Sequence, residues 1–171
     1  MPLLSQPRSQ SPDPQIDWTE VSVDLARCCC QGVALGQAPA AGDIWRDTLS
    51  RGDRYVDRAH GVELATELGL LDFIGIDVLR FPGRFLLNGD AIELGPGANE
   101  QHVTRSLGDP WWRDESDQLV RLFFEGERFE RQFELAANGL LLSIGLFRTP
   151  VMANSAQRRA YGVSKSWPPS R

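Results

Sequence analysis

The sequence predicts an α+β fold, in which antiparallel β-sheets carry short helices on one face and an internal duplication relates two parts of the chain. Several short segments alternate apolar and polar residues, as half-buried strands do. Glycines beside asparagine, proline or aspartate separate these segments, as turns do. The segment GLLDFIGI, residues 69–76, also matches GLLLSIGL, residues 139–146. Such self-similarity is typical of a duplicated unit.

The duplication suggests four parts in a chain of 171 residues, which is long enough for two small units that share a core. Residues 1–16 are rich in proline, serine and glutamine, so we expect them to be disordered. A first α+β repeat is expected over residues 17–84 and a second over residues 85–147. Residues 148–171 form a basic C-terminal tail that is predicted to pack on the body.

The first repeat begins with the strand-like residues 18–35, which include three consecutive cysteines, Cys28 to Cys30. Consecutive cysteines give neither a disulfide framework nor a metal-ligand spacing. They suit a strand that is buried on both faces in a reducing compartment. A short helix capped by Asp43 and stopped at Gly52 is expected next, and the strand-like residues 61–81 follow it.

The second repeat begins with a strand-like run over residues 83–95. A helix is predicted to begin at Asn99 and to end at Gly108, with Val103 and Leu107 facing the sheet. Asparagine is a favoured N-cap and glycine a favoured residue just after a helix.

The clearest strand lies in RFERQFEL, residues 128–135, where apolar and polar residues alternate. The residues predicted to face the core are Phe129, Phe133 and Leu135, and those predicted to face solvent are Arg128, Glu130, Gln132 and Glu134.

The tail contains one short helix, which is predicted to be capped at Asn154 and stopped at Gly162. The tail is too apolar to be a free segment, so we expect it to pack on the body with its positive charge along acidic surface. The apolar residues in question are Val151, Met152, Tyr161 and Trp167.

The net charge of −5 conceals an asymmetry, because every acidic residue precedes residue 148 and five basic residues follow residue 147. An acidic body argues against nucleic-acid binding, which needs clustered lysine and arginine. It suits either a basic protein partner or an ordinary soluble surface. The sequence shows neither an apolar run long enough for a membrane span nor a secretory signal at its start, so we expect a cytoplasmic protein.

Catalytic motifs are not evident in the sequence, and we expect no catalytic residue, no metal site and no cofactor. The two histidines, His60 and His102, do not stand in a recognisable motif with a nucleophile. Acidic residues crowd the segment from Asp109 to Asp117, where they offer carboxylates for acid–base chemistry or cation binding. Their spacing is not that of a calcium loop, and a solvated loop is the favoured interpretation.

The adjacent tryptophans Trp111 and Trp112 point in opposite directions if their turn is extended. One is expected to seal the helix onto the sheet and the other to face outward. Large aromatic side chains beside acids suit an anchor for a protein partner, with a carbohydrate platform as the alternative. The segment LGDPWWRD, residues 107–114, is matched with LSRGDRYVD, residues 49–57, as the equivalent turn of the first repeat.

The segment from LGDPWWRD to NGLLLSI, together with PVMANSAQRRAYGVSKSWPP of the tail, resembles a family of uncharacterised bacterial proteins. These proteins carry an LGxPWWxD-like turn, an LFFE-like strand and a QFEF-like strand. The resemblance covers about residues 85–168 and implies a link to toxin–immunity loci of type VI secretion and Rhs-type polymorphic toxins. The helix-plus-sheet plan is also similar to that of β-lactamase inhibitory proteins, although those are secreted and disulfide-bonded.

The resemblance implies an immunity protein that binds a cognate bacterial toxin and neutralises it by occluding its active site, without nucleic-acid or membrane partners. The alternatives are a small hydrolase-type enzyme with a non-obvious site, or an adaptor module. The predicted partner-binding residues are Asp109, Trp111, Trp112, Asp114, Glu115 and Asp117, with Asp53 and Tyr55 at the equivalent turn of the first repeat.

Overall fold

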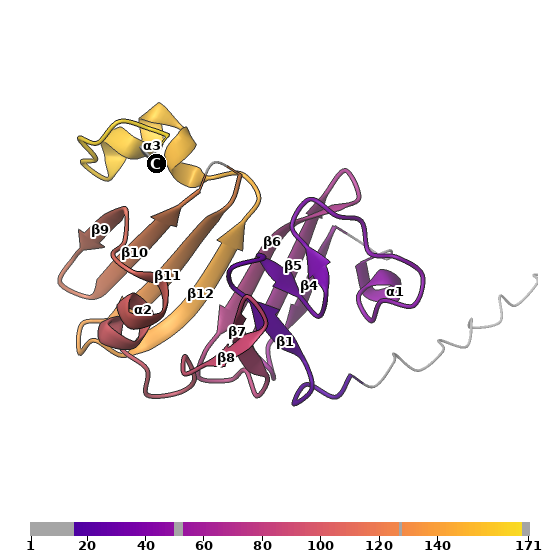
Figure 1. Cartoon of the computed structure of the whole chain (residues 1–171). Coiled ribbons are helices and arrows are strands. Elements are labelled where there is room, and N and C mark those ends of the chain that lie inside the picture. The colour runs from indigo at the N-terminus through magenta and orange to yellow at the C-terminus, as the bar shows by residue number, and fades with distance from the viewer. Residues whose placement is uncertain (1–15, 50–52, 127, 169–171) are drawn as a thin grey trace, which may run out of the picture.

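The computed structural model describes residues 16–49, 53–126 and 128–168, and in these residues two β-sheets pack against each other (Figure 1). The smaller sheet has five strands, in which β1 and β7 run parallel and all other neighbours run antiparallel. Its order is β3 (Val33–Ala34), β2 (Cys29–Cys30), β1 (Ser22–Asp24), β7 (Arg84–Leu87) and β8 (Asp90–Ile92).

The larger sheet has seven strands, and every neighbouring pair is antiparallel. It therefore forms one continuous surface that combines strands from both halves of the chain. Its order is β4 (Arg54–Asp57), β5 (Val62–Glu67), β6 (Leu70–Asp77), β12 (Leu141–Phe147), β11 (Glu130–Ala136), β10 (Leu119–Glu125) and β9 (Trp112–Glu115). The α+β class with antiparallel sheets is confirmed.

The two segments that match in sequence lie side by side at the centre of the larger sheet, as strands β6 and β12. Their pairing is symmetric, because Gly75 pairs with Gly145 and Phe73 pairs with Phe147. Each strand is flanked by a partner that carries a register shift at the same place, between Ala65 and Thr66 in β5 and between Glu134 and Leu135 in β11. By its place in the sheet, β4 corresponds to β10 and β9 is an added edge strand, so residues 49–57 and 107–114 are not equivalent.

Four short helices accompany the sheets in the described part of the chain, and two of them begin as predicted. The side chain of Asn99 caps α2 (Glu100–Leu107), which ends before Gly108, and Val103 is buried. The side chain of Asn154 caps α3 (Ser155–Ala160). The remaining helices are α1 (Arg46–Leu49) and the 3₁₀ turn η1 (Val151–Ala153). The predicted stop of the first helix at Gly52 lies outside the described residues.

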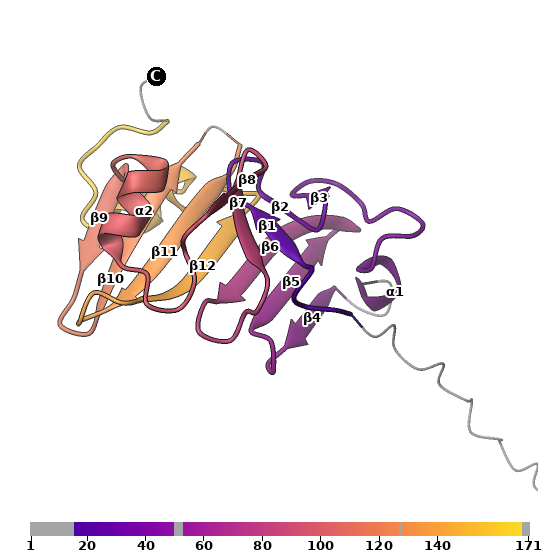
Figure 2. The ribbon, with the colours of Figure 1, turned by 60° about the horizontal axis from the view of Figure 1, so that its bottom comes forward.

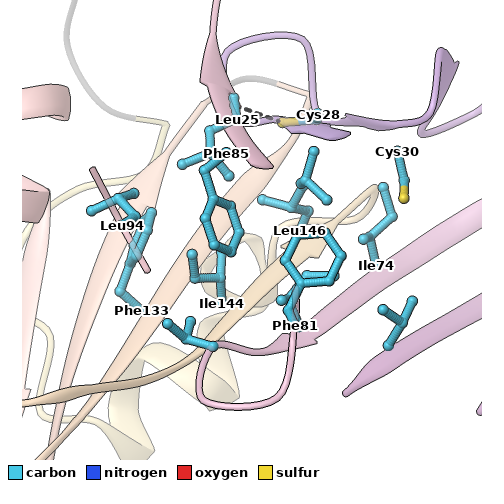
Figure 3. Close-up of a cluster of buried hydrophobic side chains, with 14 of the residues drawn as sticks. Leu25, Cys28, Cys30, Ile74, Phe81, Phe85, Leu94, Phe133, Ile144 and Leu146 are labelled. Atoms are coloured by element: carbon cyan, nitrogen blue, oxygen red, sulfur yellow. Dashed lines mark hydrogen bonds between the residues drawn. The ribbon is translucent and has the colours of Figure 1, made fainter. Parts of the chain in front are cut away.

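The core lies between the two sheets (Figure 3). The smaller sheet contributes Leu25 and Phe85, and the facing strands of the larger sheet contribute Ile74, Ile144 and Phe133, all of them buried. Burial of such side chains is worth about 1.5–3 kcal/mol each, so this interface is the main source of stability. The face of the larger sheet that meets the smaller sheet is called the inner face below, and the opposite face is the outer face.

The two faces of the larger sheet carry different neighbours. Leu122 and Phe123 are adjacent in β10 and so point to opposite faces. Leu122 pairs with Arg113, whose side chain is 3.0 Å from Glu100 of α2, so α2 lies on the inner face. Phe123 packs edge-on against Tyr161 at the end of α3, with ring centroids 5.3 Å apart, so the tail lies on the outer face. Figure 2 shows α2 and strands β1, β7 and β8 in front of the larger sheet.

A hairpin replaces the single strand-like run predicted over residues 83–95. Asn88 and Gly89 both have positive φ, as a tight turn between β7 and β8 requires. The buried carboxylate of Asp24 accepts hydrogen bonds from both backbone N–H groups of this turn. This contact between β1 and the turn holds the hairpin on the smaller sheet.

The cysteines also depart from the prediction of one strand buried on both faces. Cys28 has a positive φ of 48° and lies before β2, so the run is divided by a turn. Cys28 and Cys30 are buried and Cys29 is half-buried. Burial raises the pKa of the Cys28 thiol to about 11, which leaves it in the unreactive thiol form at neutral pH.

The tail packs on the body, with Met152 fully buried and Tyr161 against Phe123. Arg148 lies along acidic surface and is ion-paired with Asp72 at 2.8 Å and with Glu67 at 2.6 Å. Among the described residues, no helix has the length and apolar character needed to cross a membrane.

Candidate functional site: the outer face of the larger sheet

The outer face presents three parallel rows of side chains that cross the sheet from strand to strand, as the pairing register defines. The central row contains Val56, Glu63, Gly75, Gly145, Gln132, Phe123 and Trp112. The second, aromatic row contains Arg54, Ala65, Phe73, Phe147, Glu130 and Glu125. The third, charged row contains Asp77, Ser143, Glu134, Arg121 and Asp114. Along each row, the type of side chain differs between the middle of the sheet and the end covered by the tail.

The middle of the central row has no side chains, because Gly75 and Gly145 pair there. A Cβ atom at Gly75 would lie 2.7 Å from the ring of Phe73, and one at Gly145 would lie 2.8 Å from the ring of Phe147. The two rings lie 4.9 Å apart and lean over the glycines. Glycine is therefore required at both positions so that the two rings can occupy the space above the pair.

A groove with a volume of about 550 Å³ lies over this glycine pair. Its floor is formed by β6 and β12, and its rim by the turns that follow β4 and β6. Of the large apolar side chains that are exposed among the described residues, Val56 and Leu79 lie on this rim, with exposed fractions of 46% and 57%. Exposed apolar side chains around a hollow are typical of a binding surface. We call this hollow the outer groove.

Four carboxylates and two arginines line the outer groove. The carboxylates are held in position by contacts within the chain. Glu63 is 2.6 Å from Arg54, and Glu134 is 2.8 Å from Arg121 and also accepts a hydrogen bond from Ser143. The outer groove thus offers oriented oxygen acceptors beside an aromatic floor.

The end of the aromatic row is closed by the tail. Glu130 is fully buried, which contradicts the prediction that it faces solvent. Alternation along β11 does place it on the outer face, but the tail covers that face here, and the backbone N–H of Met152 donates to Glu130 at 3.2 Å. The carboxyl of Glu125 lies directly opposite on β10. Burial, with the hydrogen bond and charge of Glu130, raises the pKa of Glu125 to about 9.

Neither histidine lines the outer groove, although His60 contacts Asp57, which does. The ring of His60 stacks on Trp18, with centroids 5.1 Å apart, and its Nδ1 is 3.0 Å from the Asp57 carboxylate. Burial acts to raise the pKa of Asp57, but the hydrogen bonds and charge of His60 outweigh it and lower the pKa overall. His102 forms a capping box with Asn99 at the start of α2. Within the described part of the chain, no cluster of three or more metal-ligating side chains occurs.

The predicted contact residues near β9 do not form one surface. Trp112 belongs to the central row and Asp114 to the charged row of the outer face, whereas Glu115 is ion-paired with Arg113, which faces the other way. Asp109 and Asp117 are exposed in the turns before and after β9.

Neither tryptophan faces freely outward, contrary to expectation, because both are half-buried. The tail lies close to both residues. The Lys165 ammonium donates to the backbone carbonyl of Trp111 at 2.7 Å, and Tyr161 covers the neighbouring Phe123.

The other two predicted contact residues, Asp53 and Tyr55, lie at β4, which is the opposite edge of the sheet from β9. Asp53 is exposed, whereas Tyr55 pairs with the buried Leu64 and packs against Trp45, with ring centroids 6.3 Å apart. Tyr55 therefore belongs to the margin of the core. The structure does not bring the two predicted turns together.

Sequence reasoning missed the residues at the centre of the outer groove, although a signal was present. The first matching segment reads FIG over residues 73–75, and the second reads GLF over residues 145–147. Read in opposite directions, the two triplets have the same pattern. Two such strands pair antiparallel with glycine opposite glycine and phenylalanine opposite phenylalanine, as observed.

Comparisons with known proteins give little similarity. No family model matches the chain, and no curated protein matches it. Among solved structures, the crystal structure of a DUF4309 family protein (YjgB) from Bacillus subtilis subsp. subtilis str. 168 aligns with a TM-score of 0.37 and 14% sequence identity, and the alignment covers 67% of this chain and 72% of that chain. A similarity at this level supports no functional conclusion.

Proposed function

We propose that this chain is an immunity protein that binds a cognate bacterial toxin and neutralises it by occluding the toxin's active site. The observation that carries the proposal is the outer groove, an open hollow with an aromatic floor and an exposed apolar rim. A hollow of this kind suits the capture of a protruding side chain from a partner, because burial of that side chain provides affinity while the surrounding polar groups fix its orientation.

The charge of the outer groove favours a basic partner surface. Carboxylates outnumber arginines in its lining, and the acidic residues of the whole chain precede residue 148. Opposite charges on the partner would speed its association and select against acidic proteins. The motif resemblance to proteins of toxin–immunity loci is consistent with such a partner.

The two histidines support binding rather than hydrolysis. A general base must reach a bound substrate, but neither His60, which is stacked on Trp18, nor His102, which caps its own helix, lines the outer groove. The carboxylates that line the outer groove are ion-paired or hydrogen-bonded within the chain, as in a fixed recognition surface.

The function is tested by co-expression with the product of the neighbouring gene, with cell growth and co-purification as readouts. We expect the chain to restore growth and to co-purify with that product. If it does neither, the immunity proposal is wrong.

The surface is tested separately with rim variants. Val56→Lys and Leu79→Lys place cations on the rim and should weaken co-purification at least about tenfold through lost apolar contact and repulsion of a basic partner. Leu68→Lys and Leu140→Lys are matched controls, because these exposed leucines lie outside the outer groove. If all four variants restore growth and co-purify equally well, the immunity function stands but the outer groove is not the binding site.

A further inference from the structure

A pair of carboxyl groups lies beneath the tail at the closed end of the aromatic row. Glu125, the last residue of β10, pairs with Glu130, the first residue of β11. Glu130 is fully buried, and Oε1 of Glu125 is buried without another partner among the described residues. Acidic side chains are almost never fully buried unless they are paired, so this arrangement calls for a cause.

The tail supplies most of the hydrogen-bond donors of this pair. The indole Nε1 of Trp167 donates to Oε2 of Glu125 at 3.1 Å, and the backbone N–H of Met152 donates to Oε2 of Glu130 at 3.2 Å. The amide of Gln132 donates to the other oxygen of Glu130. The nearest cation of the tail, the Arg158 guanidinium, donates instead to the backbone carbonyls of Met152 and Ala153.

These donors leave one oxygen of Glu125 as the position for a proton. Two adjacent buried carboxylates repel each other strongly, so one of them holds a proton. Glu130 accepts hydrogen bonds on both oxygens. Glu125 accepts only one, and a proton on its remaining oxygen provides the donor toward Glu130. The closed end therefore contains one negative charge and one proton when the tail is docked.

We propose that the C-terminal segment 151–168 is a strap whose docking on the outer face is controlled by the proton held between Glu125 and Glu130, so that loss of this proton releases the strap and uncovers Phe123. Release would extend the open part of the central row from the glycine pair toward Trp112. This inference is independent of the proposed partner, since it concerns only groups within the chain.

The direction of the pH dependence follows from the two states of the strap. In the docked state the pKa of Glu125 is raised from 4.5 to about 9, whereas release exposes the group and returns its pKa toward the ordinary value. The released state thus loses its proton first as pH rises. Docking is strongest below about pH 4.5, weakens progressively between 4.5 and about 9, and loses this contribution fully above that range.

Three charged groups lie at the carboxyl pair, and they belong to the two strands and to the helix of the tail that packs on them. They are Glu125 of β10, Glu130 of β11 and Arg158 of α3, whose charge acts to lower the pKa of Glu125. Because the guanidinium stays charged across this pH range, Glu125 is the group whose titration changes the docking.

Hydrogen exchange of the full-length protein tests the strap directly. Protection of the backbone amides of residues 151–161 would be measured at pH 6 and pH 9, corrected for the intrinsic effect of pH on exchange, with β5 and β6 as the internal reference for global unfolding. We expect protection of the strap to fall by about tenfold or more between these pH values, while the reference strands change less.

The variant Glu125→Gln mimics the protonated acid, because its amide accepts from Trp167 and donates toward Glu130. Its strap should remain protected at pH 9, whereas Glu20→Gln, an exposed residue that pairs with Arg84, should behave as the unaltered chain does. A strap that keeps its protection at pH 9 without any substitution contradicts the proposal. Equal loss of protection in Glu125→Gln and in the unaltered chain contradicts it as well.

Discussion

The two ends of the outer face share the same strands but differ in what covers them. At β6 and β12 the rings of Phe73 and Phe147 cover the paired glycines and form the floor of the outer groove, and the face is open. At β10 and β11 the same rows end in Phe123, Glu125 and Glu130, and the tail covers them. A continuous sheet therefore presents one surface suited to a partner and one that is already occupied by a segment of its own chain.

The difference arises from the size of the side chains in the central row. The bulky ring of Phe123 packs against Tyr161 of the tail. The glycines have no side chains against which a covering segment could pack. The strand pairing is symmetric between the two halves of the sheet. The side chains of the outer face are not, since they are open at one end and covered by the tail at the other.

The largest expected effect concerns the covered end. Met152 is fully buried against the outer face, so Met152→Ala should lower the free energy of unfolding by about 2–4 kcal/mol. Chemical denaturation would measure this change, with Leu140→Ala as a control at an exposed position. A loss no greater than that of the control would mean that the tail is not part of the cooperative fold.

A smaller effect is expected at the open centre. In Gly145→Ala the new methyl group meets the ring of Phe147, which is itself packed on Phe73, so unfolding free energy should fall by about 1–2 kcal/mol. Gly95→Ala is the matched control, because no atom lies within 4 Å of its added Cβ. Thermal unfolding of both variants is the measurement, and equal midpoints would show that the rings move aside without cost.

The smallest effect is expected at the β9 edge, where Arg113 joins the sheet to α2 through Glu100. Exposed ion pairs contribute little, so the coupling energy from a double-mutant cycle of Arg113→Ala and Glu100→Ala should be about 0.5 kcal/mol. A coupling above about 2 kcal/mol would indicate that this edge is far more rigid than its exposure implies.

The sequence allowed prediction of those features that depend on neighbouring residues. The ends of α2 follow from Asn99 and Gly108, which act within one helical turn. The core positions Phe133 and Leu135 follow from alternation along one strand. The match between residues 69–76 and 139–146 was also visible, since it needs only comparison of the two segments.

Features that depend on distant segments were not predicted. Glu130 stands in a regular alternating pattern, but it is buried where Met152 of the tail contacts it, which its neighbours in β11 do not indicate. One of the two tryptophans at 111 and 112 was expected to face outward, but both are half-buried. The outer groove requires β6 and β12 to be adjacent, which the separate segments do not specify.

The difference in hydrogen exchange between the free chain and its complex with the neighbouring gene product tests the central claim most directly. We predict that binding increases protection in β5, β6 and β12, whose strands form the outer groove, and leaves residues 109–117 unchanged. Protection gained at residues 109–117 with none at β6 and β12 would contradict this account and would place the contact surface at the tryptophan and acid cluster instead.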